Sequence, residues 1–383
     1  MGVSLDNPTP LRRARDQRGL KQAQVVERIL AIADRIDEPV AAKSSLLIMI
    51  SQWENGKRIP EPPYRRIFRE IYGKTNDELG FPPEPEAEPL VTELEDRIIV
   101  AKRVDDETIE LFRQQTDVVR HADRRFGAAV RLDQLRSHIG EVEDLLRHTI
   151  IRKHRERLAA ALTDASTLAG WDSLDAGSIR QAWLHHEQAK TAALEAGSDA
   201  LLAHATGQQA FILIEAGNTI DAITLLEDAR SIAGQHTPRL LRAWLAAAAG
   251  EGHAAAGQRD AALRAFDEAN ALLPTETTHP ELSFLFLGGT HLDRWRGNAL
   301  AMLGEPEAIQ QLTSVLERAP HDFVRARAGV HVDLAFAYAR IGNREAARSH
   351  AQQARRIVSQ VGSVKMRRRL SRLVLPGSAS VVA

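Results

Sequence analysis

The chain has 383 residues, enough for two or three domains and a sizeable hydrophobic core. Its 50 lysines and arginines nearly balance 51 aspartates and glutamates, so the net charge of -1 indicates neither a nucleic acid nor a membrane as partner. The absence of cysteine excludes disulfides, a thiol nucleophile and a cysteine-zinc site. No apolar segment resembles a signal sequence or reaches the roughly 18 residues of a membrane span, so we expect a soluble cytoplasmic protein without membrane contact.

Helical periodicity is the only regular pattern along the chain, and we therefore expect an all-α protein. Alternating apolar and polar residues, the sign of strands, are missing, and aromatic residues make up only 5% of the sequence. Changes in composition predict a first domain at 1–81, a Pro/Glu linker at 82–89, a helical connector at 90–162, a repeat domain at 163–375 and a flexible tail at 376–383.

The first domain begins with short helices joined by turns. Thr9 can cap a helix that Gly19 ends, and a second helix begins near Lys21. A third helix is predicted from Ser45, as its N-cap, to Asn55-Gly56, where a left-handed C-cap is natural. Short helices in this arrangement are the parts of a DNA-binding helix-turn-helix.

The third helix has two distinct faces. Leu46, Ile50 and Trp53 share the face that we expect to pack inward. As a recognition helix, its outward face would enter the major groove, where an amide side chain pairs with adenine and apolar side chains meet thymine methyl groups. The residues of this face are Ser45, Ile48, Met49 and Gln52.

Polar and basic residues flank this helix and are candidates for phosphate contacts, which set affinity rather than sequence preference. They are Gln22, Lys57, Arg58, Arg65 and Arg66. The alternative is that Ile48 and Met49 belong to the core and that the arginines form a solvated rim.

A repeat begins after the connector. Five similar segments each contain a glycine, and these glycines are Gly177, Gly217, Gly257, Gly304 and Gly342. Small residues seven apart follow each glycine, as Ala182 and Ala189 do in the first copy and Ala308 and Val315, one residue tighter, in the fourth. Residues seven apart lie on one helical stripe, so the pattern predicts helix pairs that approach closely, with the glycine in the turn. An unrelated alanine-rich helical bundle is the alternative.

This pattern resembles the tetratricopeptide repeat, which has the same small-residue pair, turn glycine and terminal proline, here Pro274 and Pro320. The glycines lie 40, 40, 47 and 38 residues apart, more than the repeat's usual length of about 34. The resemblance implies an α-solenoid in which the first helix of each pair lines a groove for a peptide or another ligand.

Polar residues are unusual in the first helices of so alanine-rich a sequence. Those at or near the groove positions are His204, Glu251, Arg294 and Asn298, our candidate ligand-binding residues. Arg294 and Asn298 suit a backbone carbonyl or a carboxylate of an extended ligand. The alternative is that these residues are solvated or pair between helices.

Three segments, ISQWENG, KRIPEPPYRRIF and DELGF, resemble helix-turn-helix regulators of the phage-repressor or xenobiotic-response-element type, in the actinobacterial branch with C-terminal tetratricopeptide repeats. The likeness spans Leu11 to Phe81, and RHADRRFGAA (120–129) and LAGWDSLDAG (168–177) resemble the branch's middle segment. It implies that Ile50 and Trp53 are core, that Glu54 ties the turn, and that the outward face reaches DNA. Ile50 follows Gln22 by 28 residues, roughly twice the family's distance, so helix two is extended or a loop precedes helix three.

We therefore expect a sequence-specific transcription regulator, acting as a homodimer on double-stranded DNA, whose repeats sense a peptide, a small molecule or a protein partner. The alternative is a protein-interaction scaffold whose N-terminal domain does not bind operator DNA. No G-x-S-x-G, P-loop or H-E-x-x-H motif occurs, so we expect neither an enzyme nor a cofactor. The histidines lack ligand spacing, so no metal is expected, and the tryptophans are interpreted as packing residues.

Overall fold

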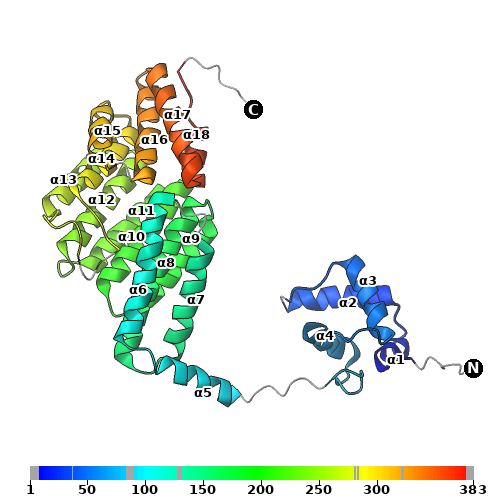
Figure 1. The fold of residues 1–383 in the computed structure, drawn as a ribbon. Coiled ribbons are helices and arrows are strands. Elements are labelled where there is room, and N and C mark those ends of the chain that lie inside the picture. Colours follow the sequence, from blue (N-terminus) through cyan, green and yellow to red (C-terminus); the bar gives the residue numbers. More distant parts are fainter. Residues whose placement is uncertain are drawn as a thin grey trace, which may run out of the picture. The chain divides into compact units, whose positions relative to one another are not determined.

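The computed structural model describes residues 8–36, 38–82, 90–126, 132–279, 282, 284–320 and 323–376. Within these residues the chain forms 18 helices and no strand, which confirms the all-α prediction. Two compact units are present, Met1–Asp96 and Arg97–Ala383, and each is described by itself (Figure 1). Most of the predicted linker and tail, at 83–89 and 377–383, lies outside the described residues.

Four helices form the N-terminal unit: α1 (Pro10–Gln17), α2 (Gln22–Arg35), α3 (Lys43–Glu54) and α4 (Pro62–Tyr72). As predicted, the Thr9 hydroxyl caps α1, accepting a hydrogen bond from the Arg12 amide at 3.3 Å. The prediction of Ser45 as the cap of the third helix was wrong. The helix begins two residues earlier, at Lys43, because the Leu46 amide already donates to the Ala42 carbonyl at 3.0 Å.

The inner face of α3 packs into the core of this unit. Leu46 and Ile50 are fully buried, and the Trp53 ring lies 4.9 Å from Tyr64 and 5.6 Å from Phe68, between ring centres. The extra distance before α3 has two sources, a 14-residue α2 and a connecting segment at 36–42. Gly56 follows α3 with a φ of +67°, the left-handed conformation expected at a helix end.

Five helix pairs make up most of the second unit, and the most extensive helix contacts lie within these pairs. They are α8 (Arg152–Asp175) with α9 (Ile179–Glu195), α10 (Asp199–Ala216) with α11 (Thr219–Ala233), α12 (Arg239–Ala255) with α13 (Arg259–Leu272), α14 (Gly289–Leu303) with α15 (Glu307–Arg318), and α16 (Val324–Arg340) with α17 (Arg344–Val361). Every predicted turn glycine lies between the two helices of a pair and has a positive φ. The repeated helix pairs are therefore tetratricopeptide-like.

The small residues of the second helices explain the close packing of each pair. Ala182 and Ala189 of α9 are completely buried, as are their counterparts in the later copies. A longer side chain on this stripe would push the two helix axes apart. Pro274 and Pro320 come two residues after the ends of α13 and α15, where the prolines were predicted to stop each second helix.

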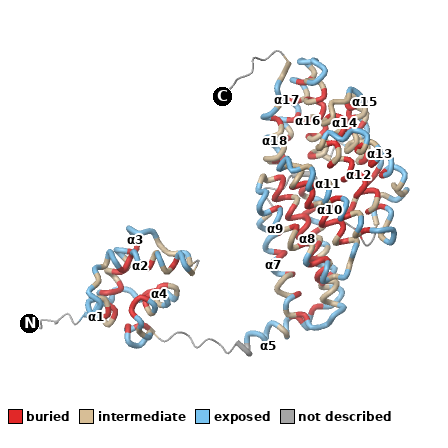
Figure 2. Tube along the Cα trace, turned by 180° about the vertical axis from the view of Figure 1, so that it is seen from behind, coloured by how far each residue is buried: buried red, intermediate tan, exposed pale blue. Residues whose placement is uncertain are grey.

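Three helices precede the pairs and one follows them. These are α5 (Leu90–Ala101), α6 (Asp106–Phe126), α7 (Leu132–His148) and α18 (Val364–Ser371). The boundary predicted between the connector and the repeat domain, between residues 162 and 163, falls inside α8, which continues through it without a break. Buried residues concentrate along α8, α10 and α12 (Figure 2). Among the described helices, none has the length and apolar content needed to cross a membrane.

Candidate ligand cavity and nucleic-acid surface

The first helices of the pairs form a closed ring. Each first helix from α8 to α16 contacts the next first helix, α6 contacts α8, and α16 returns to contact α6. The repeats therefore surround a partly open cavity of about 390 Å³. This volume is within the usual range for small-molecule sites, about 300–1,000 Å³.

Side chains that line the cavity recur at fixed positions before the turn glycines. Thirteen residues before the glycine of each pair stand Asp164, His204, Trp244, His291 and Gly329, and all five line the cavity. Six residues before the first four glycines stand Trp171, Phe211, Glu251 and Asn298, which also line it. Positions seven apart face the same side of a helix, so the register of the repeat determines which residues face inward.

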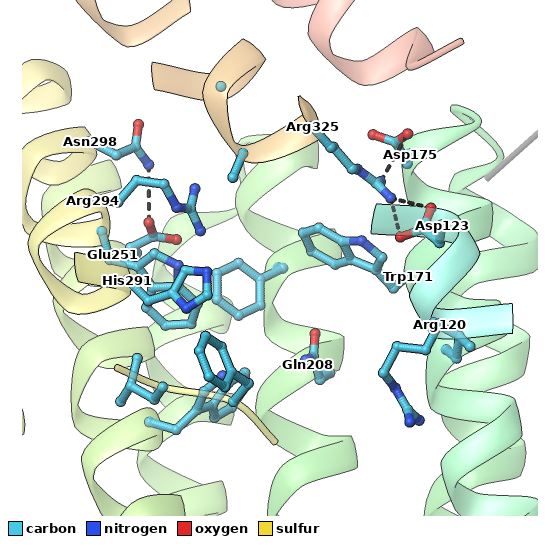
Figure 3. A pocket seen from close by; sticks show the side chains of 18 of the residues that line it. Arg120, Asp123, Trp171, Asp175, Gln208, Glu251, His291, Arg294, Asn298 and Arg325 are labelled. Carbon is cyan, nitrogen blue, oxygen red and sulfur yellow. Dashed lines mark hydrogen bonds and ion pairs between the residues drawn. The ribbon is translucent and has the colours of Figure 1, made fainter. Parts of the chain in front are cut away.

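All four candidate ligand-binding residues line this one cavity. Three of them are bonded to protein groups, two in one network: Asn298 Nδ2 donates to Glu251 Oε1 at 3.1 Å (Figure 3), and Asn298 Oδ1 accepts from Arg369 at 3.4 Å. The amide of Asn298 is thus not available in the way expected for a ligand carbonyl. Arg294, by contrast, makes no hydrogen bond or ion pair with any residue that the structure describes.

His204 is a neutral imidazole inside the aromatic wall. Burial lowers its pKa to about 3. Its ring centre lies 4.9 Å from that of Trp244 and 4.4 Å from that of Phe284. Gln208 Nε2 lies 3.3 Å from His204 Nε2 and can only donate, so the imidazole nitrogen accepts.

Aromatic rings form a continuous wall around the cavity, a role that sequence reasoning missed. Phe211 lies edge-to-face against Trp171, Trp244 and Trp295, with ring centres 6.0–6.4 Å apart. Trp171, Trp244 and Trp295 do pack, as interpreted, around Phe211, and all three line the cavity. The register of the turn glycines could have revealed this. Trp183, on α9, is partly exposed and does not line the cavity.

A buried charge cluster joins the two ends of the ring. Arg325 of α16 donates to Asp123 of α6, 202 residues earlier, and lies 2.9 Å from the Asp175 carboxylate of α8. Ser363, the N-cap of α18, donates to the other Asp175 oxygen at 2.7 Å. These contacts hold the last repeat against the first (Figure 3).

Asp172 lies beside this cluster, completely buried, and neither carboxylate oxygen has a hydrogen-bond partner. Burial and the neighbouring Asp123 raise its pKa well above the usual range. No group of three or more metal-ligating side chains occurs among the residues that the structure describes.

The outward face of α3 carries the candidate base-reading residues. Ser45 and Ile48 are exposed, while Gln52 is half-buried and its side chain makes no hydrogen bond to a described residue. Met49 is also half-buried and packs against the core of the N-terminal unit. The face therefore presents one free amide and an apolar surface next to it.

The candidate phosphate contacts divide into two groups. Lys57, Arg58 and Arg66 are exposed and make no ion pair or hydrogen bond with the described residues. Arg65 is half-buried and donates to the Pro60 carbonyl at 2.6 Å. Gln22 donates through its amide to Glu54 at 2.8 Å, so this amide is already used within the protein.

Glu54 is the link that fixes α3 relative to α1 and α2. Its buried carboxylate lies 2.6 Å from Arg15 Nε of α1 and also accepts the Gln22 hydrogen bond from α2. Its carbonyl accepts from Thr9 Oγ1 at 2.7 Å. Glu54 thus ties the end of α3 to both neighbouring helices.

No protein-family model and no curated protein matches the sequence. Solved structures that match include a putative kinesin light chain from Podosopora anserina with nearly identical TPR-like repeats, at 17% identity and a TM-score of 0.35, covering 52% of this chain and 96% of that chain. Its Q17M form matches at 17% identity and a TM-score of 0.36, covering 53% and 97%. The class of the protein, an all-helical protein of tetratricopeptide-like helix pairs, follows from its own helices and not from these distant similarities.

Proposed function

We propose that the protein is a DNA-binding transcription regulator whose repeat unit binds a ligand. The observation that carries the proposal is the surface at the end of α3. There the unbonded Gln52 amide adjoins Lys57 and Arg58, two exposed cations without protein partners. Free cations beside a helix that presents an amide suit phosphate contacts around a base-reading position.

The ligand function rests on the second unit. Its first helices surround one cavity that combines an aromatic wall with charged groups, as small-molecule sites do. A homodimer is part of the proposal, because helix-turn-helix proteins bind two half-sites about 10 base pairs apart. Sedimentation should show a dimer on DNA, and a monomer both free and bound would contradict this part.

Genomic footprinting followed by electrophoretic shift in rising salt tests the DNA function. Gln52→Ala should relax one operator position at a cost of about 1–3 kcal/mol. Arg58→Ala should weaken binding to all sequences alike and reduce the salt dependence by about one counterion. A matched control is Arg35→Ala, which removes an exposed cation paired with Glu70 on α4. If Gln52→Ala and Arg58→Ala both bind DNA as the wild-type protein does, the DNA contacts lie elsewhere.

A protein-interaction scaffold is the second candidate, and one observation favours it. Exposed apolar side chains lie on α3 and just after it, since Ile48 and Leu47 of α3 are exposed, Ile48 by 62%, and Ile59 beyond its end is 61% exposed. Such a surface suits a protein partner better than a phosphate backbone. No shift with any genomic fragment at low salt would reject the regulator and leave the scaffold.

A further inference from the structure

Arg294 is a cation of the cavity lining that makes no hydrogen bond or ion pair with any described residue. Arg294 projects from α14, and its buried Nε has no acceptor. The nearest carboxylates are held by other groups: Glu251 accepts from Asn298 at 3.1 Å, and Asp333 lies 2.5 Å from Arg369. Burial lowers the pKa of the Arg294 guanidinium, and the nearby Glu251 and Asp333 offset this only in part, so its charge has no directly bonded partner among the described residues. Arg294 is therefore poised for an anion that enters the cavity.

The electrostatic surroundings add to this preference. Burial disfavours the charged forms of Glu251 and Asp333 and raises the pKa of both, although Arg294 acts in the opposite direction. Lys365 faces the same cavity, with its Nζ 5.4 Å from the Trp171 ring centre. Figure 3 shows the Arg294 guanidinium turned toward the space between α14 and Trp171.

Gln208 supplies the complementary polar group. Gln208 lines the cavity and its Nε2 approaches His204, while its Oε1 is buried without a hydrogen-bond partner among the described residues. A buried acceptor without a donor is unfavourable, and a donor on the ligand would satisfy it. The ligand should thus carry a hydroxyl or N–H group as well as an anion.

The remaining wall selects an aromatic body. Trp244 and Trp295 lie edge-to-face with ring centres 5.8 Å apart, and both contact Phe211 in the same way. A flat ring can join such a cluster edge-to-face or offset, which adds to the burial of its apolar area. The cavity volume of about 390 Å³ limits the ligand to a compact molecule or one chain end.

We propose that the cavity binds an aromatic carboxylate with a ring hydroxyl or N–H group, its carboxylate on Arg294, its donor on Gln208 and its ring against the tryptophan wall. This inference rests on the ligand-binding part of the proposed function. The same chemistry is present in a free aromatic acid and in the C-terminal tyrosine or tryptophan of a peptide.

Calorimetric titration of the full chain without DNA tests the proposal, with 4-hydroxyphenylacetate as the main probe. Three relatives each lack one feature: 4-hydroxyphenylacetamide lacks the charge, phenylacetate the donor and 4-hydroxycyclohexylacetate the aromatic ring. We expect each to bind at least about tenfold more weakly, the loss of one directed interaction. Gly-Gly-Tyr and its C-terminal amide distinguish the sources: tighter binding of the free-acid peptide than of 4-hydroxyphenylacetate identifies a chain end, and the reverse identifies a free acid.

Variants separate binding from folding. Arg294→Met should abolish 4-hydroxyphenylacetate binding, while Arg296→Met, on the same helix but paired with Asp267 at 2.6 Å outside the cavity, should leave it unchanged. Because the Arg294 guanidinium lacks a partner, Arg294→Met should also raise the Tm of the ligand-free protein by about 2–4 °C. A structural arginine would lower it.

Three results would overturn the proposal: equal binding of the acid and its amide, unchanged binding by Arg294→Met, or no binding of any carboxylate probe. Failure of DNA binding with intact probe binding would reject the regulator alone. Failure of probe binding with intact operator binding would reject the aromatic carboxylate alone.

Discussion

Replacement of Arg325 by Met should open the ring of first helices at the contact between α16 and α6. Arg325, Asp123 and Asp175 are each at least nine-tenths buried, and the arginine is paired with both aspartates. Met keeps most of the side-chain volume, so the main loss is charge pairing. Removal of one partner from a buried ion pair costs about 3–5 kcal/mol, because the remaining charge stays buried.

Thermal unfolding followed by circular dichroism measures this cost. For a unit of this size each 1 kcal/mol lowers the Tm by about 2–4 °C, so a fall of at least about 6 °C is expected. Arg296→Met is the control, since its pair with Asp267 is largely exposed and contributes at most about 1 kcal/mol. A Tm within 2 °C of the control, on the scale just given, would refute a closed ring held by this cluster.

Three further changes test other parts of the structure. Asp172→Asn should raise the Tm at pH 7.5 and have little effect near pH 4. A raised pKa of Asp172 in the folded state costs stability as the pH rises, and asparagine removes this cost; the opposite pH trend would contradict the raised pKa. Trp53→Ala should cost about 3–5 kcal/mol and unfold the N-terminal unit while the repeats stay helical, which limited proteolysis detects; equal resistance of both units would count against it. Gly250→Ala should destabilise by about 1–3 kcal/mol because its Cβ would lie 2.6 Å from Phe266, whereas Gly140→Ala, with open space around it, should be neutral or stabilising.

The helix pairs could be predicted because their signal is local. A glycine in a turn and small residues seven apart fix where each pair begins and how closely it packs, and the structure places Gly177 and Ala182 accordingly. The cap of α3 could not be fixed in this way. Ser45 is a good cap by residue type, but the backbone bond from Leu46 to Ala42 begins the helix earlier.

The cavity was only partly predictable. Four polar residues stood out against an alanine-rich background, and they do line one cavity. Their partners did not stand out, because the bond from Asn298 to Glu251 joins residues 47 positions apart and depends on how neighbouring pairs stack. Closure of the ring could not be predicted from the sequence for the same reason, since no local pattern relates Arg325 to Asp123.

The contact between α6 and α16 can form only late in synthesis of the chain. Asp123 emerges from the ribosome 202 residues before Arg325, its partner. At typical rates of about 5–20 residues per second, α6 waits about 10–40 s before the helix that completes its environment exists. During that interval the inner face of α6 and the aromatic side chains of the early repeats are open to water and to chaperones. The last helix pair to be translated therefore buries this exposed surface in the interior of the protein.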